Sequence, residues 1–123
     1  MLEFQVRVRR WLKVCLGLQV ADDVGERSCR FMEEAVELFQ ATGGSREDAQ
    51  RLVDYVFSRP VGEPKQEVGG VTVTLAALCS ASGINMEAAA WEELERVNRP
   101  EVMEKVRAKQ ASKPHASPLP GSA

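Results

Sequence analysis

Hydrophobic side chains recur along the first part of this chain at the spacing of an α-helix. Between about Leu2 and Leu18 they lie at positions i, i+4, i+7, i+8 and i+11, which places them on one face of a helix. The positions concerned are Phe4, Val8, Trp11, Leu12 and Cys15. This pattern predicts an amphipathic helix with a solvated basic flank.

A second helix is predicted from about Glu26 to Ala41, ending at Thr42-Gly43-Gly44. Glycine after a periodic segment is a strong signal for the end of a helix. The segment Phe31–Phe39 is apolar over most of its circumference, so we expect this helix to be buried on most sides.

The next helix is expected to begin at Ser45, in a sequence that has the form of a capping box, and to end before Pro60. Its apolar stripe consists of Leu52, Val53, Val56 and Phe57.

The segment that follows is ambiguous, because Val71-Thr72-Val73-Thr74 favours a strand. The apolar character continues to Ser82-Gly83, which is too long for a typical strand, and we therefore predict a helix. Asn85 is a candidate cap for another helix, which Pro100 ends or interrupts. Residues 101–110 are expected to add a helical turn or two.

No second strand candidate exists, so the predicted class is all-α: a bundle of four or five helices over residues 1–110. Residues 111–123 are rich in proline and serine and are expected to form a flexible tail. The chain has 123 residues, 44% of them hydrophobic and 28% charged, with a net charge of −2. This balance gives no basic footprint for a nucleic-acid polymer. No segment reads as a membrane span, and the three cysteines are widely spaced, so a cytoplasmic protein is expected.

Candidate chemistry lies in the second helix, where Glu33, Glu34 and Glu37 interrupt the apolar run. At about 100° per residue they share one sector of the helix. Carboxylates crowded in a partly desolvated space repel one another, and a hard cation such as Mg²⁺, or alternatively Mn²⁺, would relieve that cost. The alternative is a solvated acidic face, which is common on helices.

Glu33-Glu34-x-x-Glu37, followed by Glu67-Val68-Gly69-Gly70-Val71, resembles the motifs of the MazG-like all-α nucleoside triphosphate pyrophosphohydrolases. The resemblance spans residues 4–110. It implies a helical homodimer or homotetramer that uses Mg²⁺ to split a nucleoside triphosphate into a monophosphate and pyrophosphate. Glu34, Glu37 and Glu67 would be the metal ligands. Glu33 would be a further ligand or would orient the attacking water.

One position departs from that family pattern, since Gly70 stands where the family has aspartate. Water, or another carboxylate such as Asp54, would then have to complete the metal site. A different interpretation is that Gly69 and Gly70 permit close packing of helices. The alternative function is therefore a weak or inactive bundle that binds nucleotide or a protein partner.

Basic residues supply candidate contacts to the substrate phosphates. Arg30 is placed between Glu37 and Glu34 around the helix, and could bind phosphate or pair with the neighbouring glutamates. Near the C-terminus the candidates are Lys105, Arg107, Lys109 and Lys113. In the resembled family a basic segment here contributes to the nucleotide pocket, but a solvated helix end is the simpler interpretation. Trp11 and Trp91 could stack on a base or serve packing.

Overall fold

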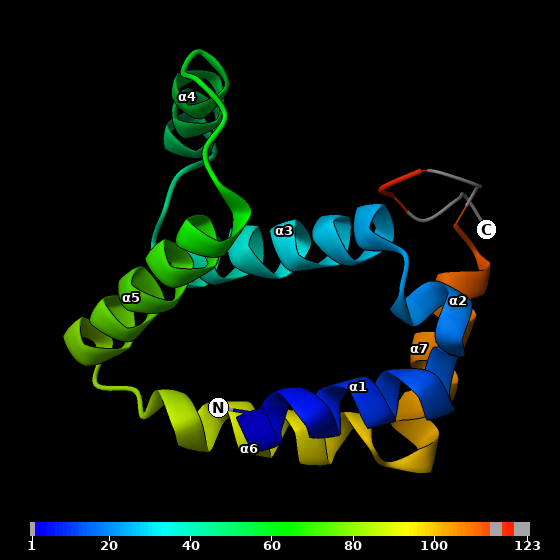
Figure 1. Ribbon diagram of the computed structural model, residues 1–123. Coiled ribbons are helices and arrows are strands. Elements are labelled where there is room, and N and C mark those ends of the chain that lie inside the picture. The colour runs from blue at the N-terminus through cyan, green and yellow to red at the C-terminus, as the bar shows by residue number, and fades with distance from the viewer. Residues whose placement is uncertain (1, 114–116, 120–123) are drawn as a thin grey trace. The chain divides into compact units, whose positions relative to one another are not determined.

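All secondary structure in the described part of the chain is helical. The computed structural model describes residues 2–113 and 117–119 (Figure 1). Its helices are α1 (Leu2–Leu16), α2 (Leu18–Ala21), α3 (Val24–Ala41), α4 (Arg46–Phe57), α5 (Pro64–Ser82), α6 (Met86–Val97) and α7 (Pro100–Ala111). The predicted all-α class is confirmed. Of the expected tail, residues 111–123, Ala111 is the last residue of α7, and residues 114–116 and 120–123 lie outside the described residues.

Several helix ends are formed by the residues that the sequence suggested. The Ser45 hydroxyl accepts a hydrogen bond from the Asp48 amide at 3.1 Å, which caps α4. Asn85 caps α6 in the same way, accepting from the Ala88 amide at 2.9 Å. Gly83 ends α5 with a φ of 68°, a left-handed conformation that glycine adopts without steric cost.

Two boundaries differ from the sequence prediction. The first predicted helix is interrupted at Gly17, whose φ of 87° separates α1 from α2. Pro100 does not end a helix but begins one, because a proline in the first turn needs no hydrogen-bond partner for its missing N–H. As a result α7 is a full helix of 12 residues, rather than a turn or two.

The ambiguous segment forms one helix, α5. The Glu63 carboxylate caps its start by accepting from the Lys65 and Gln66 amides. The Thr72 and Thr74 hydroxyls donate to carbonyls one turn earlier, so these β-branched residues are accommodated in the helix. No single helix of the described chain is long and apolar enough to cross a membrane; only α5 and α6 taken together reach that length and composition.

The chain divides into two compact units. Unit 1 comprises Met1–Glu34 and Ala90–Ala123, and unit 2 comprises Ala35–Ala89. In unit 1, α1 packs against α2 and α7. The buried apolar residues of unit 1 are Cys15, Ala21 and Leu94. The Trp11 indole N–H donates to the Val97 carbonyl at 2.9 Å and ties α1 to the end of α6.

Unit 2 exposes most of its apolar side chains. Among its described residues only Cys79 is a buried hydrophobic residue. On α4 and α5 the exposed ones are Leu52, Val53, Tyr55, Val56, Phe57, Val68, Val71 and Val73. The expectation that the acidic helix is buried on most sides is also wrong for the single chain: α3 has no buried residue. Periodicity predicts which side of a helix is apolar, but not whether the same chain covers it.

Candidate functional site

The predicted acidic residues of the second helix all lie on α3. Glu33 is half-buried, whereas Glu34 and Glu37 are exposed. The helix remains regular through all three positions, so Glu33 and Glu37 are one turn apart. Glu33 and Glu34 belong to unit 1, and Glu37 belongs to unit 2.

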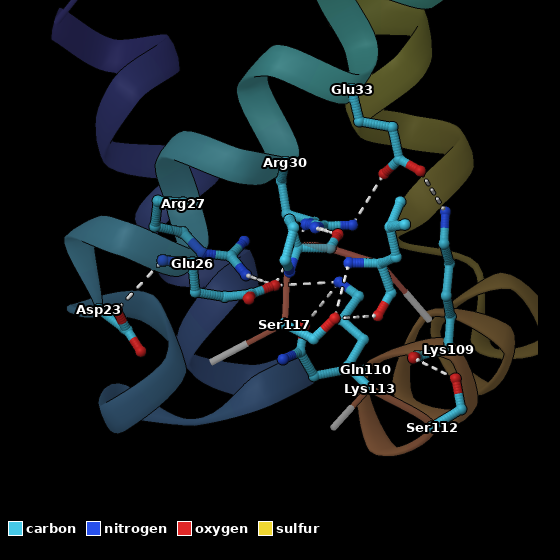
Figure 2. Close-up of polar contacts among 12 residues, drawn as sticks. Asp23, Glu26, Arg27, Arg30, Glu33, Lys109, Gln110, Ser112, Lys113 and Ser117 are labelled. Atoms are coloured by element: carbon cyan, nitrogen blue, oxygen red, sulfur yellow. Dashed lines mark hydrogen bonds and ion pairs between the residues drawn. The ribbon is translucent and has the colours of Figure 1, made fainter. Parts of the chain in front are cut away.

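The Glu33 carboxylate is paired with two cations of unit 1 (Figure 2). The Arg30 guanidinium donates to one carboxylate oxygen at 2.9 Å, and the Lys109 ammonium group, from α7, lies 3.4 Å from the other. Arg30 also lies 3.2 Å from the Glu26 carboxylate, one turn earlier on α3. Pairing of Arg30 with a neighbouring glutamate, one of the two interpretations of this residue, is thus present in the structure.

A second ion pair of this network joins Glu26 on α3 to Lys113, just beyond α7. Their charged groups are 2.9 Å apart, and the side chains are 14% and 5% exposed. Burial of Glu26 opposes its ionisation, but the hydrogen bond from Lys113 and the charges of Lys113, Arg30 and Arg27 outweigh it. The pKa of Glu26 is therefore lowered. Glu26 was not among the predicted site residues. Its spacing of four residues from Arg30 was the available signal.

The other basic candidates have separate roles. Arg107 donates to the Cys15 carbonyl at 2.9 Å and to the Val14 carbonyl at 3.3 Å, so it satisfies acceptors near the end of α1. Lys105 makes no ion pair or hydrogen bond within residues 2–113 and 117–119. Of the C-terminal basic residues proposed to bind phosphate, only Lys109 contacts a predicted catalytic residue.

Glu34 has a basic neighbour on α6. The pKa of Arg96 is raised chiefly by its hydrogen bond to Glu93, and the charge of Glu34 adds to this effect. Glu34 and Arg96 both belong to unit 1. The predicted metal ligand therefore lies in a mixed electrostatic environment rather than in a purely acidic one.

Glu67 lies in the first turn of α5, in unit 2. Its carboxylate lies against the loop before the helix, because a Cβ atom on Gly62 would be only 2.5 Å from the nearer carboxylate oxygen. Gly70 lies one turn further on, and a Cβ atom there would have no neighbour within 4 Å. Gly69 is equally open, so within the chain neither glycine is required for close helix packing. Asp54 is exposed on α4.

The chemistry of these side chains suits a hard divalent ion, since carboxylate oxygens are the ligands that Mg²⁺ prefers. A metal site also needs several such side chains close together. Across the described residues of one chain, no three histidine, cysteine, aspartate or glutamate side chains are grouped so that they could hold a metal ion. The donors are therefore appropriate in kind, with Glu33 and Glu34 in unit 1 and Glu37 and Glu67 in unit 2.

Comparisons with known proteins add no assignment. The chain matches no protein-family model, no curated protein and no solved structure.

Proposed function

We propose that this protein is a MazG-like, Mg²⁺-dependent nucleoside triphosphate pyrophosphohydrolase that works as a homo-oligomer. The observation that carries the proposal is the spacing of four glutamates on two helices, Glu33, Glu34 and Glu37 on α3 and Glu67 in the first turn of α5. This arrangement resembles the motif pair of that family, except that Gly70 stands where the family has aspartate. The reaction would release a nucleoside monophosphate and pyrophosphate.

In this proposal Glu34, Glu37 and Glu67 hold Mg²⁺, with Mn²⁺ as an alternative ion. The bound ion would neutralise phosphate oxygens and acidify a coordinated water. Glu33 would orient the attacking water or accept its proton. Contacts to Arg30 at 2.9 Å and Lys109 at 3.4 Å restrict the position of the Glu33 carboxylate, which supports a positioning role for both cations.

The homo-oligomer is part of the same proposal. The exposed apolar side chains of α4 and α5 form surfaces that water solvates poorly, among them Leu52, Val56 and Val68. A second copy of the chain would cover such surfaces and could contribute carboxylates to the same metal site.

The direct test is to incubate the purified protein with Mg²⁺ and a panel of ribo- and deoxynucleoside triphosphates, and to measure monophosphate and pyrophosphate. We expect hydrolysis that EDTA abolishes and that Glu37→Gln reduces by at least a hundredfold, because the substitution removes a charged metal ligand. Glu47→Gln is the matched control, since Glu47 is an exposed glutamate in the first turn of α4. Absence of product with every nucleotide would reject the proposal.

A second function is favoured by one observation, the glycine at position 70. With one carboxylate fewer than the resembled family, the bundle could bind nucleotide or a protein partner without cleaving anything. Calorimetry separates the two functions. A binding module would retain its affinity in EDTA and in Glu37→Gln, whereas the hydrolase would lose metal-dependent triphosphate binding in both.

A further inference from the structure

Unit 1 contains a pocket that the proposed reaction does not use. Its volume is about 510 Å³, within the usual range for small-molecule sites, and it lies between α1, the second half of α6 and the start of α7. Its aromatic and polar lining residues are Arg7, Arg10, Trp11, Trp91, Glu95 and Asn98, and aliphatic side chains complete the walls. All of them belong to unit 1.

The two indole rings are held in place by tertiary contacts. The N–H of Trp11 is already bonded to the Val97 carbonyl at 2.9 Å. The Trp91 ring packs edge-to-face with Phe4, with ring centres 5.1 Å apart and an interplanar angle of 79°. Because these contacts restrict both rings before any ligand arrives, little side-chain entropy is lost when a flat aromatic group stacks on them.

The two arginines of the pocket differ in whether they already have a partner. Arg7 is paired with Glu3 at 3.3 Å and lies over the Trp91 ring at 5.9 Å. Arg10, one helical turn away, has no ion pair or hydrogen bond with any residue in the described parts of the chain. A guanidinium has five N–H donors in a planar fork that matches a phosphate or carboxylate. One unpartnered arginine therefore suits one anionic group.

The acceptors of the pocket are on α6 and just after it. Asn98 uses its amide N–H₂ to donate to the Leu94 carbonyl at 3.0 Å, which leaves its carbonyl oxygen as an acceptor. Glu95 contributes a carboxylate that has no partner among the described residues. Both groups accept hydrogen bonds, so they favour a ligand ring that carries an amino group.

We infer that this pocket binds a nucleoside monophosphate whose base carries an exocyclic amino group. The base would stack on the tryptophans, its amino group would donate to Asn98 or Glu95, and the phosphate would pair with Arg10. The inference does not depend on the proposed hydrolysis, since it uses neither a metal ion nor any of the four motif glutamates.

Tryptophan fluorescence gives a selective readout, because Trp11 and Trp91 are the only two tryptophans of the chain and both line the pocket. The titration is done in EDTA with AMP and CMP as probes, and with UMP, cytidine and inorganic phosphate as comparisons. We expect a saturable change with AMP and CMP, at least several-fold weaker binding of UMP and cytidine, and no change with phosphate alone. No saturable change with AMP or CMP at millimolar concentration would overturn the inference, and so would an equal response to phosphate.

Arg10→Gln should raise the Kd for CMP about five- to tenfold, the loss expected for one charge-assisted contact at a partly exposed site. Arg46→Gln is the matched control, because Arg46 is an exposed arginine of unit 2 without a partner in the described chain, and it should leave the Kd unchanged. Arg10→Lys, which keeps the charge, should retain part of the affinity, so that a folding defect in Arg10→Gln would be recognised. Equal effects of the Arg10 and Arg46 substitutions would reject the assignment.

Glu37→Gln separates this inference from the proposed function. It should reduce hydrolysis by at least a hundredfold and leave the fluorescence response to CMP intact. A response lost in Glu37→Gln would mean that CMP binds at the proposed hydrolytic site instead, which would overturn the inference.

Discussion

Lys113 lies next to the proline- and serine-rich C-terminal residues, yet its ion pair with Glu26 gives it a structural role. Lys113 precedes the proline- and serine-rich residues, yet its side chain is 5% exposed and its ammonium group lies 2.9 Å from the Glu26 carboxylate. Arg30 connects the same carboxylate to Glu33. The charges of α3 in unit 1 are therefore stabilised in part by a residue that follows the last helix.

Lys113→Met should reduce the free energy of unfolding at neutral pH by about 2 kcal/mol, because Glu26 would remain largely buried with one donor fewer. Urea unfolding measures the change. Lys105→Met is the control, since Lys105 has no partner within the described residues, and it should alter stability by less than about 0.5 kcal/mol. Equal effects of the two substitutions would show that the ion pair does not stabilise the fold.

The ion pair between Glu26 and Lys113 also predicts that the free energy of unfolding depends on pH. The pKa of Glu26 is lowered from 4.5 in the folded chain, so on acidification the unfolded state binds the proton first. The stabilisation is fully present above pH 4.5 and is lost as the pH falls through the folded-state pKa. Urea midpoints measured at decreasing pH should show this loss. The Glu26→Gln variant should lack this pH-dependent stabilisation. If its urea midpoint depended on pH as strongly as that of the wild type, Glu26 would not be the group responsible.

Gly70 provides a residue-scale test of the resemblance. A Cβ atom there meets nothing within 4 Å, so Gly70→Asp is sterically permitted and would add a carboxylate one turn from Glu67. We expect tighter Mg²⁺ binding by several-fold in calorimetry, because a fourth oxygen ligand would replace water. Gly69→Asp adds the same charge at an equally open position on another side of the helix. Equal gains from both substitutions would indicate general electrostatic attraction instead of a ligand position.

At the scale of the elements, local sequence determines the helices and most of their ends. Ser45 and Asn85 cap α4 and α6 because a short polar side chain can reach the free amide three residues later. The segment around Val71-Thr72-Val73-Thr74 becomes helical because Pro64 and the Glu63 carboxylate organise its first turn. Its threonine hydroxyls also donate to carbonyls within the helix.

Two glycines of α5, one at its C-terminal cap and one inside the helix, allow predictions of opposite sign. Gly83→Ala should lower stability by about 1 kcal/mol, because alanine is strained at a φ of 68°. Gly69→Ala should raise stability by about 0.5–1 kcal/mol, because this position lies inside the helix and has room for a methyl group. Thermal unfolding compares them. Destabilisation by Gly69→Ala would indicate that another chain packs closely on this part of α5.

At the scale of the whole molecule, the main feature is apolar surface that the chain leaves exposed. Unit 2 presents the stripes of α4 and α5 to solvent, and its described residues include Cys79 as the only buried hydrophobic residue. A unit that buries so little apolar area gains little from the hydrophobic effect. Association with a second copy would supply the missing burial, and the proposed function includes it for this reason.

Val56→Glu should weaken self-association at least tenfold, because it places a charge on the exposed stripe of α4 that a partner would cover. Sedimentation velocity across a range of protein concentrations measures this effect. Val24→Glu is the matched control, since Val24 is a more exposed valine in unit 1, at 81% compared with 57%. A wild-type protein that stays monomeric at every concentration would reject the oligomer.

The sequence by itself determined the all-α class, the position of α3 through α6 and the capping residues, because these depend on backbone hydrogen bonds and side chains within a few residues. It also supplied the four glutamates and their spacing. Only the tertiary structure decided that Lys109 pairs with Glu33, that Lys113 is buried against Glu26, and that Trp11 and Trp91 line one pocket. These contacts join residues up to about ninety positions apart, and periodicity carries no information about which faces meet. The apolar stripes of unit 2 show the same limit, since the sequence pattern predicts which surface is apolar but not which element or chain covers it.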